Sequence, residues 1–185
     1  MVNIEISDKA NYEDSKLPID GRIHACKKCS GLECCGVLEE GGSLEPPYLT
    51  RQDIQLIEYH TGFSKKQFAV QRVNPVTGNK IYTMKVTPNY GCIFFDFNKG
   101  NCGIHSFRPM DCRLFPLDIR FIDNSYYWAL FKYKHCNLSP RDIDILLKYK
   151  DVALTMLGNE LHDYSTYPIP GMTKIGYQLI MNLTC

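Results

Sequence analysis

Apolar and polar positions recur with two different spacings along the chain, and these spacings predict a mixture of helices and strands. Thr50 can cap a helix whose apolar face recurs at helical spacing, and Gly62 can end it. The sequence Ser64-Lys65-Lys66-Gln67 has the form of a capping box and predicts a short helix through about Arg72. A turn is expected at 74–79, where asparagine, proline, threonine and glycine gather.

Segments rich in β-branched and aromatic side chains predict strands. These segments are residues 80–86, 92–97, 117–121 and 126–134. The turn sequence Asp123-Asn124-Ser125 separates the last two, which should therefore form a hairpin. Residues 102–116 carry cysteines and prolines, and we expect an ordered loop or a short helix there.

Ser139 and Pro140 predict the start of the longest helix, whose apolar stripe runs to about Leu161. The segment from Ile175 to Leu183 is expected to be weakly helical. Together these elements predict a small α+β fold, with a short antiparallel sheet and roughly three to four helices. We expect an N-terminal arm at 1–20, one domain at 21–165 and a C-terminal tail at 166–185.

The composition of the chain narrows the classes of function. Its 185 residues have a formal net charge of +1, which argues against nucleic acid bound by a broad basic surface. No apolar run reaches the ~18 residues of a membrane helix. The first eight residues are mixed and acidic, unlike the basic and apolar regions of a signal peptide. We therefore expect the cytoplasm, where cysteines stay reduced.

The chain has nine cysteines, and in the cytoplasm these favour metal binding or catalysis over disulfides. Cys185 stands far from the others and is interpreted as an ordinary packed cysteine. The other eight have short spacings typical of ligands, although some could be buried cysteines that only pack. The predicted metal and cofactor ligands are Cys26, Cys29, Cys34, Cys35, Cys92, Cys102, Cys112 and Cys136.

Thiolates in a Cys26-x2-Cys29 turn can both reach one metal at ~2.3 Å. Cys34 and Cys35 are adjacent, and adjacent side chains tend to diverge, so we hypothesise that they serve two different centres. Four thiolates suit either tetrahedral zinc or a 4Fe-4S cluster. The spacing matches neither a ferredoxin nor a zinc ribbon, so it leaves the metal open.

Side chains beside the cysteines could tune such centres. Arg108 and Arg113 bracket Cys112, and they could hydrogen-bond sulfur or form structural ion pairs. Histidines near the cysteines could be ligands or donors, or could simply be satisfied by backbone carbonyls. These are His24, His105 and His135. A dry aromatic shell is expected from Phe94, Phe95, Phe97, Phe107 and Phe115.

The order of these residues resembles the YkgJ-type cysteine-cluster family, also called the CxxCxxCC family. The stretches that carry the resemblance are Cys26-x2-Cys29-x4-Cys34-Cys35, Cys92, Cys102-x2-His105-x2-Arg108-Pro109-x2-Cys112-Arg113-x-Phe115-Pro116, and Cys136. The four residues between Cys29 and Cys34 are a departure, because the family usually has fewer. The resemblance implies a zinc- or iron-chelating domain. A related domain in a flagellin lysine methylase, thought to carry an iron–sulfur cluster, favours iron–sulfur over zinc.

Three functions follow as alternatives. We favour a non-catalytic iron–sulfur protein with one or two 4Fe-4S clusters, which responds to redox state or oxygen on a larger protein complex. The first alternative is an iron–sulfur-dependent redox or methyl-transfer enzyme, for which no catalytic residue can be named. The second is a structural zinc-binding module. The expected partner is another protein, and neither a nucleic acid nor a membrane span is expected.

Overall fold

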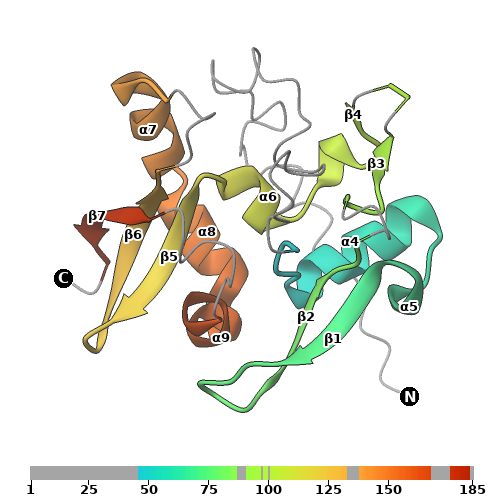
Figure 1. Cartoon of the computed structure of the whole chain (residues 1–185), viewed down its shortest axis with the longest axis horizontal. Coiled ribbons are helices and arrows are strands. Elements are labelled where there is room, and N and C mark those ends of the chain that lie inside the picture. Colours follow the sequence, from blue (N-terminus) through green and yellow to red (C-terminus); the bar gives the residue numbers. More distant parts are fainter. Residues whose placement is uncertain are drawn as a thin grey trace.

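The computed structural model describes residues 46–86, 91–96, 98–99, 101–132, 138–167 and 176–183. The predicted N-terminal arm and first cysteine stretch, and also Phe97 and His135, lie outside these residues. Within them the fold class is α+β, as predicted (Figure 1). Three small antiparallel sheets and six α-helical segments make up the described part of the chain.

The helix α4 (Arg51–Thr61) begins and ends as the sequence predicts. The Thr50 hydroxyl accepts a hydrogen bond from the Asp53 amide at 3.0 Å, and the Asp53 carboxylate accepts one from the Thr50 amide at 3.0 Å. Gly62 ends the helix with φ of +71°, a left-handed conformation that favours glycine. Local capping chemistry therefore fixes both ends of this helix.

The short helix expected through Arg72 is only partly right. α5 (Lys65–Phe68) starts at the predicted capping box, but the chain then continues as the strand β1 (Ala69–Val73). β1 pairs antiparallel with β2 (Lys80–Met84), so the predicted turn and following strand are confirmed. The helix prediction fails beyond Phe68 because hydrogen bonding to β2 outweighs a local preference.

A second hairpin is much shorter than the strand predicted at 92–97. It consists of β3 (Phe95–Asp96) and β4 (Asn101–Cys102), while Cys92 forms only an isolated bridge with Val86. The following segment contains a 3-10 turn, η1 (His105–Phe107), and the helix α6 (Met110–Leu114). This confirms the ordered loop or short helix expected at 102–116.

The third sheet contains the predicted hairpin and one strand that the sequence did not reveal. β5 (Leu117–Ile122) pairs with β6 (Ser125–Phe131) across the turn residues Asp123 and Asn124, whose φ values are +48° and +62°. β7 (Tyr177–Asn182) then pairs with the other edge of β6. The weakly helical end expected there is wrong, because distant hydrogen-bonding groups on β6 select an extended backbone.

The long helix expected from Ser139 to Leu161 is interrupted. Its start is confirmed, since Ser139 caps α7 (Pro140–Leu147). The chain then forms α8 (Lys150–Leu157), the 3-10 turn η2 (Gly158–Glu160) and α9 (Leu161–Thr166). Gly158 has φ of +46°, which no α-helix residue adopts, and this lets α9 turn back toward β5 (Figure 1).

The described residues form two groups of buried apolar side chains. The larger cluster joins the β5–β6 hairpin to α8 and α9, and the smaller cluster joins α4, α5 and β2. Trp128, Ile119 and Ala153 are fully buried in the larger cluster, as are Ile57 and Phe68 in the smaller one. Among the described helices, none is long and apolar enough to cross a bilayer.

Candidate metal centre

Three of the eight predicted ligands lie in the described part of the structure. They are Cys92, Cys102 and Cys112, and each is partly buried. The remaining predicted ligands, Cys26, Cys29, Cys34, Cys35 and Cys136, lie outside the described residues. Their role as ligands, and their division between two centres, therefore stays a prediction.

Cys92 and Cys102 belong to the same packed region beside the β3–β4 hairpin. Cys102 pairs with Phe95 across the hairpin, and the Cys92 carbonyl accepts a hydrogen bond from the Phe95 amide at 2.9 Å. Both cysteines pack against the smaller core cluster, together with Phe94 and Phe107. Two of the five phenylalanines expected around the cysteines therefore share this apolar environment.

Burial controls the proton affinity of these two thiols. Burial, together with a smaller electrostatic contribution from the neighbouring Cys102, raises the pKa of Cys92 to about 11. Burial also raises the pKa of Cys102, while the positive charge of Arg108 opposes this effect. Both side chains are therefore thiols at neutral pH, and a metal would have to displace a proton from each.

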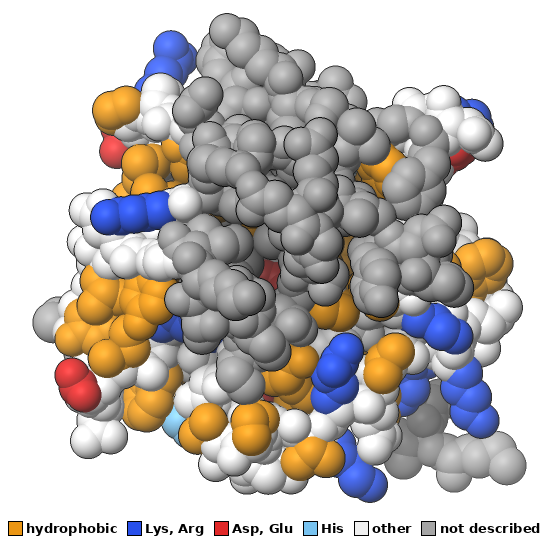
Figure 2. All heavy atoms as spheres, in the orientation of Figure 1, with side chains coloured by type: hydrophobic (Ala, Val, Ile, Leu, Met, Phe, Trp, Pro, Cys, Tyr) orange, Lys and Arg blue, Asp and Glu red, His pale blue; other side chains and the backbone are white. Residues whose placement is uncertain are grey.

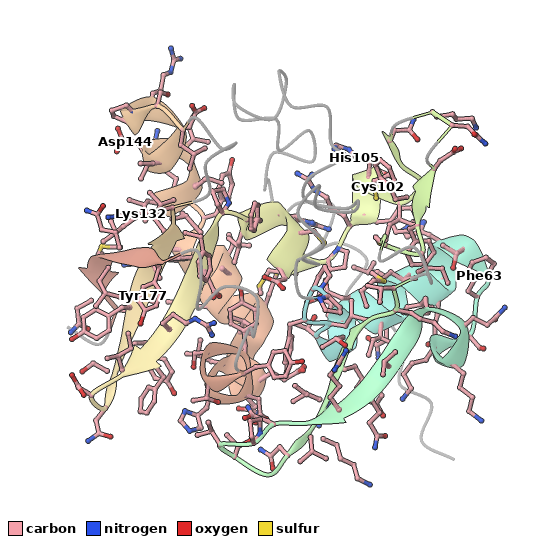
Figure 3. The ribbon with its side chains drawn as sticks, viewed as in Figure 1. Phe63, Cys102, His105, Lys132, Asp144 and Tyr177 are labelled. Carbon is pink, nitrogen blue, oxygen red and sulfur yellow. The ribbon has the colours of Figure 1, made fainter. Side chains whose placement is uncertain are left out.

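Arg108 lies between two of the residues that the sequence singled out. Its Nη1 is 3.4 Å from Nε2 of His105, and its charge acts on Cys102. Figure 3 shows Cys102 and His105 next to each other beside the β3–β4 hairpin. The sequence placed Arg108 near Cys112, and in the structure its charge acts on Cys102.

Cys112 lies on α6, a helix of five residues that has no side-chain cap of its own. Asp53 takes the place of such a cap, because its Oδ1 accepts a hydrogen bond from the Met110 amide at the start of α6, at 3.0 Å. Arg113 donates from Nε to the Arg108 carbonyl at 2.7 Å, which closes the loop before the helix. Burial lowers the pKa of Arg113 to about 10.

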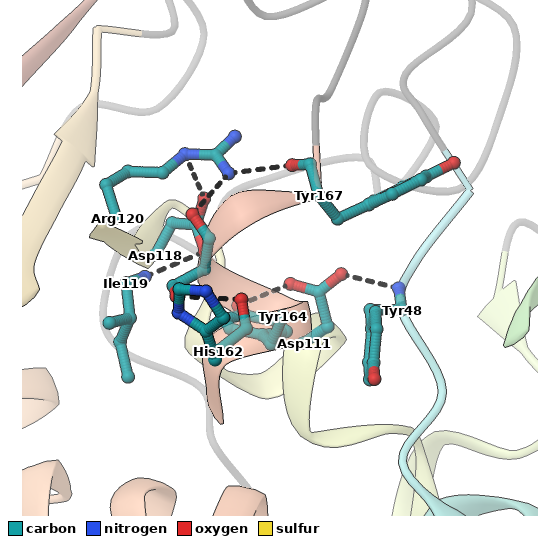
Figure 4. Close-up of polar contacts among 9 residues, drawn as sticks. Tyr48, Asp111, Asp118, Ile119, Arg120, His162, Tyr164 and Tyr167 are labelled. Carbon is teal, nitrogen blue, oxygen red and sulfur yellow. Dashed lines mark hydrogen bonds and ion pairs between the residues drawn. The ribbon is translucent and has the colours of Figure 1, made fainter. Parts of the chain in front are cut away.

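Asp111, the residue before Cys112, anchors α6 to two distant parts of the chain (Figure 4). Its Oδ2 accepts a hydrogen bond from the Tyr48 amide at 2.8 Å, and its Oδ1 accepts one from the Tyr164 hydroxyl at 3.0 Å. Tyr164 belongs to α9, so this carboxylate joins three segments that are far apart in the sequence. The backbone around Cys112 is thus held from both sides.

The same tyrosine connects Asp111 to an ion pair at the start of β5. Tyr164 also interacts electrostatically with Asp118, whose Oδ2 lies 3.1 Å from Nε of Arg120. Arg120 donates from Nη1 to the Tyr167 carbonyl at 2.9 Å (Figure 4). We call Asp111, Asp118, Arg120 and Tyr164 the carboxylate network.

These carboxyls bind protons more tightly than exposed carboxyls do. Burial raises the pKa of Asp111 to about 7, and the negative charge of Asp118 adds to the effect. Burial raises the pKa of Asp118 as well, against the attraction of Arg120. Burial also raises the pKa of Asp53 to about 6, because desolvation outweighs its hydrogen bonds from Thr50 and Met110.

Sequence reasoning did not identify the contacts of Asp53 with α6, and it did not single out the carboxylate network. Asp111 stands inside the Arg108-Pro109-x2-Cys112 stretch, so its position beside a predicted ligand was a usable signal. Tyr164 and Asp118 gave no comparable signal, because their meeting depends on how α9 folds back onto β5.

A family model described as "Putative zinc- or iron-chelating domain" and named CxxCxxCC matches residues 25–137. The chain belongs to the CxxCxxCC family. This confirms the resemblance, and it supports metal binding by this CxxCxxCC protein. The matched range contains all eight cysteines predicted as ligands.

No curated protein and no solved structure matches this CxxCxxCC chain. In the described residues alone, no group of three or more histidine, cysteine, aspartate or glutamate side chains is arranged to hold a metal ion.

Proposed function

We propose that this CxxCxxCC protein holds iron as one or two 4Fe-4S clusters, bound by the eight cysteines between Cys26 and Cys136. In this proposal the cluster responds to redox state or oxygen, and the protein has no catalytic activity of its own. It acts in the cytoplasm as an accessory to a larger protein complex. Family membership supports zinc or iron chelation, and the cluster and its role are the finer proposal.

The observation that carries the choice of iron–sulfur is the environment of Cys92 and Cys102. Both pack against an apolar cluster with Phe94 and Phe107, and the charge of Arg108 acts on Cys102. Solvent exclusion and nearby positive charge are the means by which proteins tune the reduction potential of a cluster. A structural zinc ion has no reduction potential that such features could tune.

The test is the content of iron, zinc and acid-labile sulfide in protein purified without oxygen, together with the absorption spectrum before and after exposure to air. We expect iron and sulfide in similar amounts, a brown colour, and bleaching in air. The loss of absorbance should be reversed by reconstitution with iron and sulfide under reducing conditions.

A structural zinc site is the second candidate, because the family model names zinc as well as iron. In that case the same preparation would be colourless, would contain zinc without sulfide, and would not change in air. That outcome would refute the redox role, and it would leave the protein as a zinc-stabilised domain.

A further inference from the structure

Positive charge is concentrated in one part of this nearly neutral chain. Residues 46–86 contain six lysine and arginine residues but only two aspartate and glutamate residues, although the net charge of the whole chain is +1. One of the two carboxylates is that of Asp53, which is buried inside the protein. This segment therefore presents an excess of positive charge to the solvent.

Most of this charge gathers on α5 and the β1–β2 hairpin. Figure 2 shows lysine and arginine side chains between hydrophobic ones in this region, at the lower right. We call this surface the basic hairpin, and its charged members are Lys65, Lys66, Arg72, Lys80 and Lys85. Among the residues that the structure describes, none of these five forms an ion pair.

Two members of the basic hairpin have partners that leave their charge uncompensated. The Lys65 ammonium lies 3.1 Å from the Tyr82 hydroxyl and 4.2 Å from the centre of that ring. The Arg72 Nε donates to the Thr83 hydroxyl at 3.1 Å. These contacts hold both cations against the hairpin, so they form a fixed positive surface.

Among the described strands, β1 of the basic hairpin has one edge without a partner strand. β2 pairs with β1 on one side and with the segment before α4 on the other, where the Met84 amide donates to the Pro47 carbonyl at 2.8 Å. β1 pairs only with β2 among the described strands. Within the described part of the chain, backbone groups along its outer edge have no partner strand, and another extended chain could pair with them.

Apolar side chains line the same edge strand. Val70 is 37% exposed and Val73 is 61% exposed, and they lie on opposite faces of β1, opposite Thr83 and Lys80. An added strand would cover such side chains while its backbone pairs with β1. Valines offer no flat surface on which a base could stack, so the combination favours a polypeptide over a single-stranded nucleic acid.

We propose that the outer edge of β1 binds an extended acidic segment of a partner protein by strand addition. Backbone hydrogen bonds to β1 would give register, the apolar side chains of the segment would cover Val70 or Val73 on one face, and the basic hairpin would attract the acidic ones. None of the residues of this surface is a proposed metal ligand, so substitutions here can be tested separately from the proposed cluster.

The test uses the full-length protein and a fluorescein-labelled peptide of ten residues in which aspartate and valine alternate. A control peptide of equal charge has proline in place of each valine, and proline lacks the amide hydrogen that a paired strand needs. Fluorescence anisotropy should show binding of the first peptide, at least about tenfold weaker binding of the second, and weakening of both by salt.

A pair of double variants separates this surface from general charge effects. Lys66→Glu with Lys80→Glu should weaken binding of the first peptide at least about tenfold. The control is Arg141→Glu with Lys148→Glu, which makes the same change of net charge. Arg141 lies in α7 and Lys148 directly follows it, and both are exposed, so this variant should bind the first peptide as wild type does.

Three results would overturn the proposal. Equal affinity for the two peptides would show attraction by charge without strand addition. Tighter binding of a ten-nucleotide single strand than of the first peptide would assign the surface to nucleic acid. The absence of peptide binding at about 1 mM would remove the site altogether.

Discussion

Asp53 connects two helices through one carboxylate. Its Oδ2 accepts hydrogen bonds from the amide and the hydroxyl of Thr50 at the start of α4, and its Oδ1 accepts one from Met110 at the start of α6. The residue is only 1% exposed, so this carboxylate has exchanged water for three protein donors. A single buried side chain thus fixes the position of the helix that bears Cys112.

Asp53 should make the protein less stable as the pH rises. Because its pKa is raised from 3.8 to about 6, the folded state binds this proton more tightly than the unfolded state does. The stabilisation is complete below about pH 4 and is lost by about pH 6, and it amounts to about 3 kcal/mol. Urea unfolding at several pH values gives the free energy of unfolding of wild type and of Asp53→Asn. The part of the difference between the two that depends on pH is the contribution of this proton.

The matched control for this prediction is Asp144→Asn at an exposed position of α7. The difference between wild type and Asp53→Asn should change more between pH 4 and pH 6 than the difference between wild type and this control. An equal change for the two variants would show that the pKa of Asp53 is not raised by burial. The negative charge of Glu160 adds to the effect of burial on the pKa of Asp53. Glu160→Gln should therefore narrow the pH range over which Asp53 changes the stability.

At the scale of elements, the carboxylate network ties α6, β5 and α9 together. Each element is short, and α6 and α9 have only five and six residues. Helices of this length are not stable in isolation, so their positions depend on such tertiary contacts. Tyr164 is the central member, because its hydroxyl donates a hydrogen bond to Asp111 and the side chain interacts electrostatically with Asp118.

Replacing Tyr164 with phenylalanine should lower the free energy of unfolding by about 1–3 kcal/mol, because a buried carboxylate loses its donor while the apolar ring remains. Tyr126→Phe is the control, since its hydroxyl makes one exposed contact with Nδ1 of His162 at 3.2 Å. Urea unfolding of both variants at one pH checks this. Equal, small losses would show that the network does not hold the elements together.

The elements that sequence predicted well are those specified by neighbouring residues. The caps of α4, the 74–79 turn and the β5–β6 hairpin each depend on residues within a few positions of one another. β1 and β7 were missed because their extended form depends on pairing with β2 and β6. The break at Gly158 was missed because an apolar stripe does not show where a helix bends.

The candidate site shows the same division. Cysteine spacing was enough to name the predicted ligands and the family, which the match over 25–137 confirms. The support of α6 by Asp53 and Asp111 could not be predicted, since it depends on contacts between residues distant in the sequence. Spacing identifies candidate ligands, whereas their surroundings follow from the tertiary fold.

At the scale of the whole molecule, the β1–β2 hairpin joins the two core clusters. Ile81 of β2 belongs to the larger cluster and Met84 to the smaller one. The hairpin turn is fastened to α9 by Asn74, which is fully buried and donates from Nδ2 to the Asp163 carbonyl at 2.9 Å and to the Thr166 hydroxyl at 3.0 Å. The two halves of the described fold should therefore unfold together.

Replacing Asn74 with alanine should lower the free energy of unfolding by about 1–3 kcal/mol, because a buried acceptor loses its donor at the junction. Asn159→Ala, at an exposed position of η2, is the control and should change stability by less than about 0.5 kcal/mol. Thermal unfolding followed by circular dichroism checks both. Two separate transitions in the wild type would contradict the joint unfolding of the two clusters.

The most direct test of the central claim is the iron content per chain of Cys112→Ser, purified without oxygen beside wild type and Cys185→Ser. The proposal predicts iron in wild type and in Cys185→Ser, and a large loss in Cys112→Ser, because Cys112 is a proposed ligand and Cys185 is not. Wild-type iron content in Cys112→Ser would contradict its role as a ligand. A wild-type protein that contains zinc and no iron would contradict the cluster itself.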